Sequence, residues 1–188
     1  MKALVMKSTG SWYDVLTEGG EQLSCRLRGQ FRIHGIKSTN PVVVGDHVTV
    51  ERETDGTATI VGIDTRRNYI ERKSTNLSKI SHVIAANIDL LCVVATLGLP
   101  RTSTGFIDRL LVTAEAYHIP ACLVFNKVDL YDDVLWQAFN ELSAIYTAAG
   151  YPVLAVSALQ GTGLETLKEA IVGRTVLFSG HSGVGKSA

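Results

Sequence analysis

A glycine-rich segment near the end of the sequence has the residue types that hold phosphate groups. Residues 180–187 read GHSGVGKS, which fits the pattern G-x-x-x-x-G-K-[ST], and the apolar run TVLF ends one residue before them. Glycines let successive backbone N–H groups turn inward around phosphate oxygens, Lys186 can reach the β- and γ-phosphates, and the Ser187 hydroxyl can join a Mg²⁺ shell. For His181, inside this loop, a solvent-exposed position is favoured over a catalytic role.

A second segment carries groups that distinguish guanine from adenine. The apolar run ACLVF leads into Asn126, Lys127, Val128 and Asp129, which spell NKVD. The Asp129 carboxylate can accept both the N1–H and the exocyclic N2–H of guanine, a pair that adenine does not offer. Losing such a contact should cost about 2–5 kcal/mol. We expect Asn126 to brace the loop and approach the purine, and the aliphatic stem of Lys127 to lie over the base.

A third loop, SAL, follows the run PVLAV one helix and one strand later. We expect the Ala158 N–H to donate to guanine O6 and Ser157 to steady the turn. Both base-reading loops precede the phosphate loop, the reverse of the usual order, yet a parallel sheet can bring all three to one edge. The predicted nucleotide-binding residues are Asn126, Lys127, Val128, Asp129, Ser157, Ala158, Gly180, His181, Ser182, Gly183, Val184, Gly185, Lys186, Ser187 and Ala188, with Ser187 also as the metal ligand.

The elements that must position these loops alternate between strands and helices from residue 83 to residue 188. Strands are predicted at 88–95, 121–125, 152–156 and 175–178, and helices at 104–117, 133–149 and 163–172. Continuous apolar strands separated by helices imply a parallel sheet that is covered on both faces. In such a sheet the ligand-binding loops lie at the carboxyl ends of the strands.

Residues 1–70 have a different texture, with short runs of β-branched and apolar residues broken by turns. Turn signals are Gly19-Gly20, Asn40-Pro41 and Asp55-Gly56, the last of which is typical of a hairpin. Five or so short strands suggest a small closed barrel, because closure removes exposed edges. An oligonucleotide-binding (OB) type is the leading candidate, and an SH3-like barrel stays open. The charged stretch 71–82 is predicted to be a linker.

The bulk composition limits the class of protein. A chain of 188 residues that is 46% hydrophobic can fill the cores of two modest domains. It has no run of about twenty apolar residues and no signal-peptide core at its start, which indicates a cytoplasmic protein without a membrane segment. Cys25, Cys92 and Cys122 lie far apart, and two of them stand inside apolar runs, so we expect buried, reduced thiols.

The zero net charge conceals a gradient along the chain. Residues 1–79 hold 12 lysines and arginines against 9 acidic residues, whereas residues 80–188 hold 6 against 9. Two basic clusters stand out, one of Arg26, Arg28, Arg32 and Lys37, the other of Arg66, Arg67, Arg72, Lys73 and Lys79. Such clusters are typical of a surface that faces a polyanion, although an ordinary solvated face explains them equally well.

The chain as a whole resembles one known family. The barrel, RRNYIERKS, AANIDLLCVV, FIDRLL, NKVDL, VSAL and SGVGKS match in order and spacing the circularly permuted GTPases that act on the small ribosomal subunit, the RsgA or YjeQ family. The resemblance implies an N-terminal all-β OB-type barrel followed by an α/β P-loop GTPase domain. It also implies a barrel that contacts ribosomal RNA, GTP hydrolysis stimulated by the small subunit, and a role late in that subunit's maturation.

Members of that family continue past the phosphate loop with a switch threonine, a D-x-P-G segment and a C-terminal Cys/His zinc domain. This chain ends at Ala188. We therefore expect an incomplete GTPase domain without catalytic residues, hydrolysis at background rate, and Zn²⁺ only in the absent C-terminal domain. The expected ligands are GTP or GDP with Mg²⁺. The expected setting is a cytoplasmic monomer that binds the small ribosomal subunit and its rRNA and no membrane.

Two alternatives stay open. The chain could be an RNA-binding OB module whose nucleotide domain acts as a switch without hydrolysis. It could also be an adenine-nucleotide enzyme of the same fold, such as a kinase. A comparison of GDP with ADP binding separates the second alternative from the main prediction.

Overall fold

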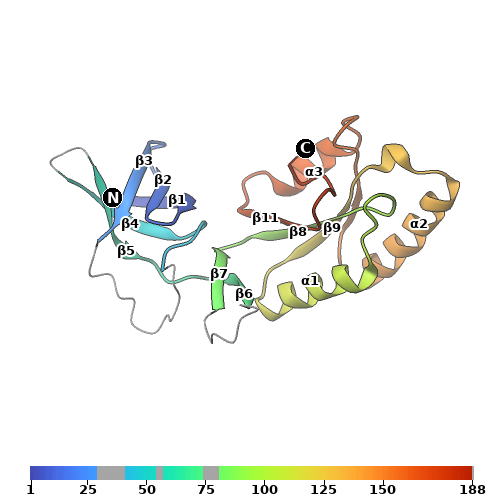
Figure 1. Ribbon diagram of the computed structural model, residues 1–188, viewed down its shortest axis with the longest axis horizontal. Helices are drawn as coiled ribbons and strands as arrows, with labels where there is room; N and C mark the ends of the chain where they lie inside the picture. Colours follow the sequence, from blue (N-terminus) through green and yellow to red (C-terminus); the bar gives the residue numbers. More distant parts are fainter. Residues whose placement is uncertain (29–40, 54–56, 74–80, 188) are drawn as a thin grey trace. The chain divides into compact units, whose positions relative to one another are not determined.

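The computed structural model describes residues 1–28, 41–53, 57–73 and 81–187, and of residues 72, 73, 81 and 82 it describes the backbone alone. The chain divides into two units, Met1–Asn87 and Ile88–Ala188, called here the barrel unit and the sheet unit (Figure 1). Each unit has its own hydrophobic core, one built between the strands of a barrel and the other between a sheet and its helices.

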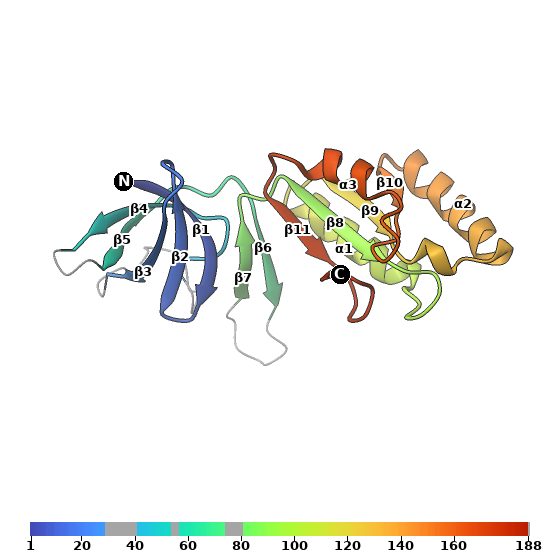
Figure 2. The ribbon, with the colours of Figure 1, turned by 90° about the horizontal axis from the view of Figure 1, so that it is seen from above.

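Five strands of the barrel unit close into a barrel in the order β1-β2-β3-β5-β4, with β4 pairing back onto β1 (Figure 2). The strands are β1 (Lys2–Thr9), β2 (Trp12–Thr17), β3 (Gln22–Leu27), β4 (His47–Arg52) and β5 (Ala58–Ile63). β3 and β5 pair in parallel, whereas β4 and β5 are antiparallel. This Greek-key order is that of an OB-type barrel, so the predicted fold is confirmed and the SH3-like alternative is set aside.

Alternation along the strands fills the barrel. Val5, Val15, Val48, Val50 and Ile60 point inward and are at most 1% exposed. Burial of each such side chain contributes roughly 1.5–3 kcal/mol to the stability of the fold. The period-2 pattern places these side chains on one face of every strand, and closing the barrel buries that face. The predicted hairpin at Asp55-Gly56 lies outside the described residues, as does Asn40. Among the described residues next to that position, the Glu53 N–H donates to the Thr57 carbonyl at 2.8 Å.

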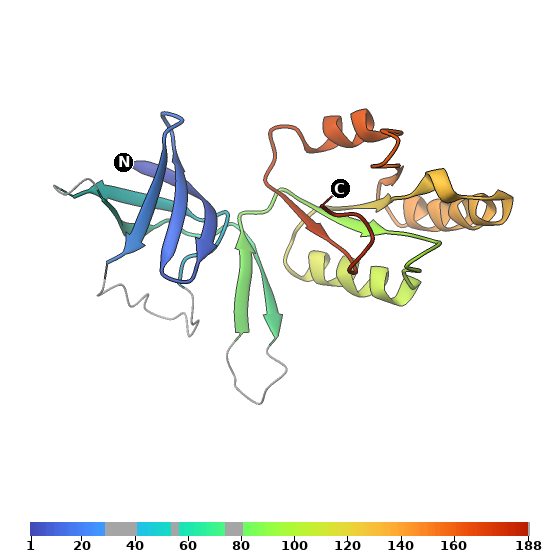
Figure 3. The same cartoon turned by 45° about the horizontal axis from the view of Figure 1, so that its top comes forward.

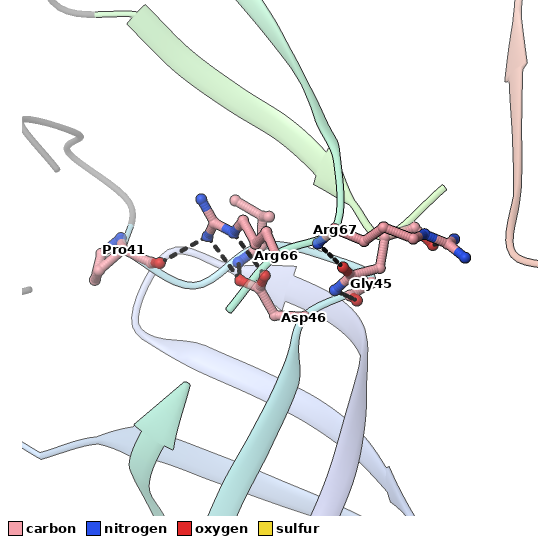
Figure 4. A network of polar contacts seen from close by, with 7 residues as sticks. Pro41, Gly45, Asp46, Arg66 and Arg67 are labelled. Carbon is pink, nitrogen blue, oxygen red and sulfur yellow. Dashed lines mark hydrogen bonds and ion pairs between the residues drawn. The ribbon is translucent and has the colours of Figure 1, made fainter. Parts of the chain in front are cut away.

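Arg66 differs from both interpretations of its basic cluster, a surface that faces a polyanion and an ordinary solvated face. Its guanidinium donates to both carboxylate oxygens of Asp46 at 2.7 and 2.8 Å and to the Pro41 carbonyl at 3.0 Å (Figure 4). The Asp46 side chain is fully buried and that of Arg66 is 10% exposed. Asp46 also accepts from the Val43 N–H at 2.8 Å. Arg66 is therefore largely buried within the barrel unit, and its charge is paired with that of Asp46.

The rest of the basic clusters is mixed. Arg28 lies 3.7 Å from Glu51 in an exposed ion pair, and the Arg67 N–H donates to Asn87 Oδ1 at 2.8 Å. Arg32, Lys37 and Lys79 lie outside the described part of the chain. Within the described part of the first cluster, Arg26 lies over an aromatic ring, that of Trp12.

A two-stranded antiparallel sheet follows the barrel, formed by β6 (Tyr69–Lys73) and β7 (Ser81–Ala86). Within the barrel unit it is joined to the segment before β4, because the Ala86 N–H donates to the Val44 carbonyl at 3.0 Å and Asn87 Nδ2 donates to the Gly45 carbonyl at 2.8 Å. Parts of β6 and β7 thus occupy the stretch 71–82 that the sequence suggests as a linker. The division between the units falls after Asn87, and the boundaries 1–70 and 83–188 stay a prediction.

The sheet unit has four parallel strands in the order β10-β9-β8-β11. In chain order its elements are β8 (Leu90–Ala95), α1 (Thr104–Ala116), β9 (Ala121–Phe125), a 3-10 turn η1 (Val128–Leu130), α2 (Asp133–Ala148), β10 (Val153–Ala155), α3 (Leu164–Ile171) and β11 (Val176–Ser179). These bounds agree with the predicted strands and helices to within two residues at each end. The middle strands β8 and β9 are buried along their whole length, as their unbroken apolar runs predict.

Helices cover both faces of this sheet (Figure 3). Leu164, Leu167 and Ile171 of α3 pack on the face that holds Cys92 and Val124. On the other face Phe139 of α2 meets Phe125 edge-on, with ring centroids 5.6 Å apart. Tyr146 of α2 donates to Asp108 of α1 at 2.8 Å, so α1 and α2 lie side by side. This helix–sheet–helix arrangement confirms the predicted covering of both faces.

All three cysteines are buried and free of disulfides, as predicted. Cys92 on β8 and Cys122 on β9 are register partners, with their sulfur atoms 3.4 Å apart. Burial raises the pKa of the Cys25 thiol to about 11, so this thiol stays protonated and packs as a small apolar side chain.

Candidate nucleotide-binding site

Four loops leave the carboxyl ends of the four parallel strands at one edge of the sheet. They are the β8 loop (residues 96–103), the NKVD loop (126–129), the SAL loop (157–159) and the phosphate loop (180–187). Because the strand order is β10-β9-β8-β11, the SAL and NKVD loops lie on one side of the β8 loop and the phosphate loop lies on the other. This is the edge at which open α/β sheets bind ligands.

The NKVD loop turns sharply as it leaves β9. Lys127 adopts a left-handed conformation with φ of 66°, and the residues after it form η1. The Val128 N–H donates to the Val156 carbonyl at 3.2 Å, which holds the turn against the strand end next to it. A left-handed conformation is uncommon for a residue with a side chain and is found where the surroundings impose it, often at binding sites.

Asn126 joins three of the four loops. Its side chain is 4% exposed; Nδ2 donates to the Val184 carbonyl of the phosphate loop at 2.9 Å. Its Oδ1 accepts from the Ala158 N–H of the SAL loop at 3.0 Å. The base-reading and phosphate loops therefore meet despite their reversed order in the sequence. The Ala158 N–H, which we expected to face guanine O6, is engaged by Asn126, so the bracing role of Asn126 extends further than the sequence indicates.

Asp129 is oriented by the SAL loop. The Ser157 hydroxyl donates to Asp129 Oδ1 at 2.5 Å and accepts from the Gln160 N–H at 3.1 Å. Ser157 is fully buried, so its position is fixed by the fold. A carboxylate oxygen has two lone pairs, and Asp129 therefore keeps acceptor capacity on both oxygens for a pair of donors. Ser157 thus steadies the carboxylate as well as the turn.

Two glycines of the phosphate loop stand where a side chain would clash or be strained. A Cβ added to Gly180 would lie 2.3 Å from the Val94 carbonyl oxygen, closer than any real contact, and Gly183 has a φ of 81° that favours glycine. Val184 is fully buried and anchors the loop beneath. The glycines therefore leave backbone uncovered at these points, and that arrangement suits close approach to phosphate oxygens.

Polar groups of the phosphate loop are partly engaged with the loop itself. Lys186 Nζ donates to the carbonyls of His181 at 2.6 Å and of Gly180 at 3.0 Å. Ser182 and Ser187 are exposed, while Ala188 lies outside the described residues. A lysine that rests on carbonyl oxygens can exchange them for phosphate oxygens, which are stronger acceptors because they are charged.

His181 is exposed, as expected, but it is not without contacts. Its ring stacks on Phe106 in the first turn of α1, with centroids 3.7 Å apart and planes at 27°. This contact links the phosphate loop to a helix on one face of the sheet. The stacking holds the His181 ring on Phe106, and its listing among the nucleotide-binding residues stays a prediction.

The β8 loop is a part of the site that the sequence did not indicate. Lys127 Nζ donates to the Leu99 carbonyl at 3.0 Å, so the lysine stem runs from the NKVD loop to the β8 loop. Thr96 and Thr102 close this loop at its base, where the Thr96 N–H donates to Thr102 Oγ1 at 3.1 Å. The Leu99 contact uses a backbone carbonyl, which any residue type offers. The sequence does give one signal for this loop, because TLGLP (residues 96–100) stands directly after a central strand, where ligand-binding loops lie.

Metal clusters and membrane-spanning helices are both absent from the described part of the chain. Within the described ranges no three His, Cys, Asp or Glu side chains gather in a way that could hold a metal ion. Mg²⁺ bound with phosphates does not need such a cluster, because it takes few protein ligands and keeps water and phosphate oxygens. Of the helices described, none combines the length and the apolar character that crossing a bilayer requires.

Comparison with known protein families gives matches over both units. Residues 63–188 match the model of the RsgA GTPase family and residues 2–60 match the RsgA N-terminal domain. The chain is 52% identical over 187 residues to the small ribosomal subunit biogenesis GTPase RsgA of Bacteroides fragilis. It is 51% identical over 190 residues to the protein of that name from Flavobacterium johnsoniae. Both matches cover 100% of this chain, which spans 60% and 58% of the two relatives.

Solved structures show the same likeness. The crystal structure of YjeQ from Thermotoga maritima superposes with a TM-score of 0.80 at 35% identity, over 99% of this chain and 62% of that one. The structure of YloQ, described as a circularly permuted GTPase, gives 0.74 at 28% identity, over 98% of this chain and 61% of that one. The loop order in both the sequence and the fold thus has counterparts in solved proteins.

Proposed function

This chain belongs to the RsgA family of GTPases, and from that premise we propose that its sheet unit binds GTP and GDP across the NKVD, SAL and phosphate loops. The observation that carries the proposal is the double hydrogen bond of Asn126, which ties both base-side loops to the phosphate loop. One nucleotide can then contact Asp129 through its base and Lys186 through its phosphates.

In this proposal each group has a defined task. Asp129 accepts from guanine N1–H and N2–H, and Lys127 covers the base. Ser157 holds the Asp129 carboxylate in place, and Asn126 holds the SAL loop. Backbone N–H groups of residues 180–187 surround the phosphates, with Lys186 neutralising their charge. Ser187 joins the shell of a Mg²⁺ ion, which would supply electrostatic stabilisation of the phosphates when bound.

For the whole protein we propose GTP hydrolysis and a role in biogenesis of the small ribosomal subunit, the activity named for its relatives. Late maturation, cytoplasmic location and a monomeric state belong to the same proposal. Any Zn²⁺ is assigned to a part of the whole protein outside these 188 residues. The support is the identity of about half of the residues over the full chain.

Nucleotide titration tests the proposal at the base. The chain should bind GDP by calorimetry and ADP at least about a hundredfold more weakly. Asp129→Asn should lose GDP affinity by about 2–5 kcal/mol and gain affinity for XDP, because xanthine presents an acceptor where guanine presents a donor. Asp133→Asn, an exposed aspartate in the first turn of α2, removes the same charge and should leave GDP binding unchanged. Equal affinity for GDP and ADP would favour the adenine-nucleotide alternative.

We further propose that the barrel unit contacts single-stranded ribosomal RNA. The supporting observation is an Arg26 guanidinium 4.1 Å from the centre of the Trp12 ring, on a tryptophan that is 36% exposed. Trp12 and Arg26 are register partners on β2 and β3, the strands that OB barrels use for oligonucleotides. An accessible ring with a cation stacked on it can receive an RNA base and its phosphate.

Binding of a single-stranded RNA of roughly 12 nucleotides, followed by anisotropy at several salt concentrations, tests this contact. Trp12→Ala should weaken binding by about 1–3 kcal/mol, the usual worth of one stacked base. Met6→Ala, which truncates an exposed apolar residue on the neighbouring strand β1, is the control. RNA binding that is unaffected by Trp12→Ala would place the contact elsewhere, and RNA binding without any GDP binding would favour the module alternative.

A further inference from the structure

The β8 loop is held firmly between the two halves of the proposed nucleotide site. On one side the Leu99 carbonyl accepts from Lys127 Nζ at 3.0 Å. On the other side Pro100 Cγ lies 3.5 Å from the point where a Cβ on Gly183 would stand. Leu99 therefore contacts the base-reading loop, and Pro100 lies close to the phosphate loop.

The frame of this loop is rigid. Thr96 is fully buried and Thr102 is 4% exposed. They are joined by the hydrogen bond from Thr96 N–H to Thr102 Oγ1 at 3.1 Å and by one from Thr102 N–H to the Thr96 carbonyl at 2.8 Å. The Thr96 hydroxyl also donates to the Pro100 carbonyl. Gly98 approaches the Leu135 side chain of α2, at 3.9 Å from an added Cβ. A loop with so many internal and neighbouring contacts presents its tip in a fixed place.

At that tip stands a leucine that the protein does not cover. Leu99 is 84% exposed, although the residues on either side of it are partly buried. Single exposed leucines are common on protein surfaces and by themselves indicate nothing. Here the backbone of the same residue is bonded to the lysine that is proposed to cover the base, which places Leu99 at the border of the ligand site.

The order of the loops gives the part of the ligand that lies there. In a nucleotide the ribose joins the base to the phosphates, and in this sheet β8 joins the base-side strand β9 to the phosphate-side strand β11. The section of the site formed by the β8 loop therefore corresponds to the ribose and the adjoining edge of the purine. These carbon-rich surfaces gain from contact with an aliphatic side chain, whereas the phosphates do not.

We propose that Leu99 is a further nucleotide-binding residue, which packs against the ribose and the adjoining purine edge of the bound guanosine nucleotide. The inference rests on the proposed function and deepens it, because it assigns a nucleoside-contacting role to a loop outside the NKVD, SAL and phosphate motifs. Since the contact does not involve the phosphates, it strengthens GDP and GTP binding by the same factor.

Calorimetric titration of the 188-residue chain with GDP and with GTP tests the proposal. Leu99→Ser should raise both dissociation constants by about tenfold, as expected for losing a partly buried leucine contact. Leu99→Met should stay within about twofold of the wild type, because methionine restores apolar contact at this place. Val172→Ser, which makes a similar change at a 71% exposed residue after α3, should have no effect.

Three outcomes overturn the proposal, and they are distinct from one another. Leu99→Ser that binds GDP within about twofold of the wild type shows that the side chain does not contact the ligand. A lower melting temperature of Leu99→Ser without nucleotide shows that the leucine packs on the protein instead. A wild-type chain that binds no GDP overturns the proposed function together with this inference, whereas the first two outcomes leave the proposed function standing.

Discussion

Replacing Asn126 by alanine removes the side chain that connects three loops of the site. Two hydrogen bonds disappear, from Nδ2 to the Val184 carbonyl at 2.9 Å and from the Ala158 N–H to Oδ1 at 3.0 Å. Val184 is fully buried and Asn126 itself is 4% exposed, so water has little access to the groups left behind. The substitution therefore leaves one acceptor and one donor unsatisfied next to the sheet.

The magnitude follows from these two groups. Each buried polar group without a partner costs about 1–3 kcal/mol, and the Ala158 N–H, being only partly buried, falls at the low end. We expect a loss of about 2–4 kcal/mol in the free energy of unfolding without nucleotide. With a urea m-value of about 2 kcal/mol per molar, the unfolding midpoint moves down by about 1–2 M. The affinity for GDP falls as well, because the SAL and phosphate loops are no longer held in register.

Urea unfolding followed by far-ultraviolet circular dichroism, with and without GDP, measures both effects. Asn140→Ala is the matched control, since Asn140 is exposed in the middle of α2 and alanine is the better helix former. Unfolding midpoints that agree between Asn126→Ala and Asn140→Ala would refute the idea that Asn126 couples the loops. A stability loss without any change in GDP affinity would show that the loops keep their binding geometry independently.

Two further predictions concern buried groups. Arg66→Met leaves the fully buried Asp46 carboxylate without its charged partner. Urea unfolding should therefore show a loss of about 3–5 kcal/mol in the free energy of unfolding, and adding Asp46→Asn to the same chain should restore part of it. A loss below about 1 kcal/mol would contradict this role of Arg66. Burial raises the pKa of Tyr131 from 10.0 to about 12, and the nearby Leu97 backbone opposes this shift in part. The folded state therefore holds this proton more tightly than the unfolded state. The contribution of Tyr131 to the free energy of unfolding is complete below pH 10 and is lost as the pH rises towards about 12. The Tyr131 hydroxyl is buried with no hydrogen-bond partner in the part of the chain described; Tyr131→Phe should therefore gain up to about 1 kcal/mol at pH 7 and lose less stability at alkaline pH, as thermal unfolding against pH would show.

Much of the site was predictable because its residue types and its place in the fold agree. Asp129 and Lys186 are side chains that few other types could replace, and each follows an apolar run that must end at the same sheet edge. The predicted OB-type barrel and GTPase fold, and the family itself, are confirmed. The assignment of individual residues to guanine, phosphate and Mg²⁺ stays a prediction until nucleotide binding is measured.

The features that escaped prediction lack a local signature. Leu99 reaches Lys127 through its carbonyl, a group common to all residues. Arg66 pairs with Asp46, which stands twenty positions earlier in the chain. The residues next to Arg66 in the sequence therefore do not show that this member of the basic cluster is partly buried. In β6 and β7, charged and hydroxyl residues conceal the alternation that marks a strand, and pairing between the two segments supplies the missing stability.

The pairing of β8 with β11 has a consequence for how the site is assembled during protein synthesis. The Thr175 N–H bonds to Asp89 across 86 positions, and Asn126 bonds to Val184 across 58. As the chain emerges from the ribosome, β8, β9 and β10 are complete while the partner of β8 has yet to be made, so one edge of a central strand waits without hydrogen bonds. Contacts of such long sequence separation form late. The loops that we propose to read guanine are therefore translated before β11 and the phosphate loop, whose Val184 carbonyl accepts from Asn126.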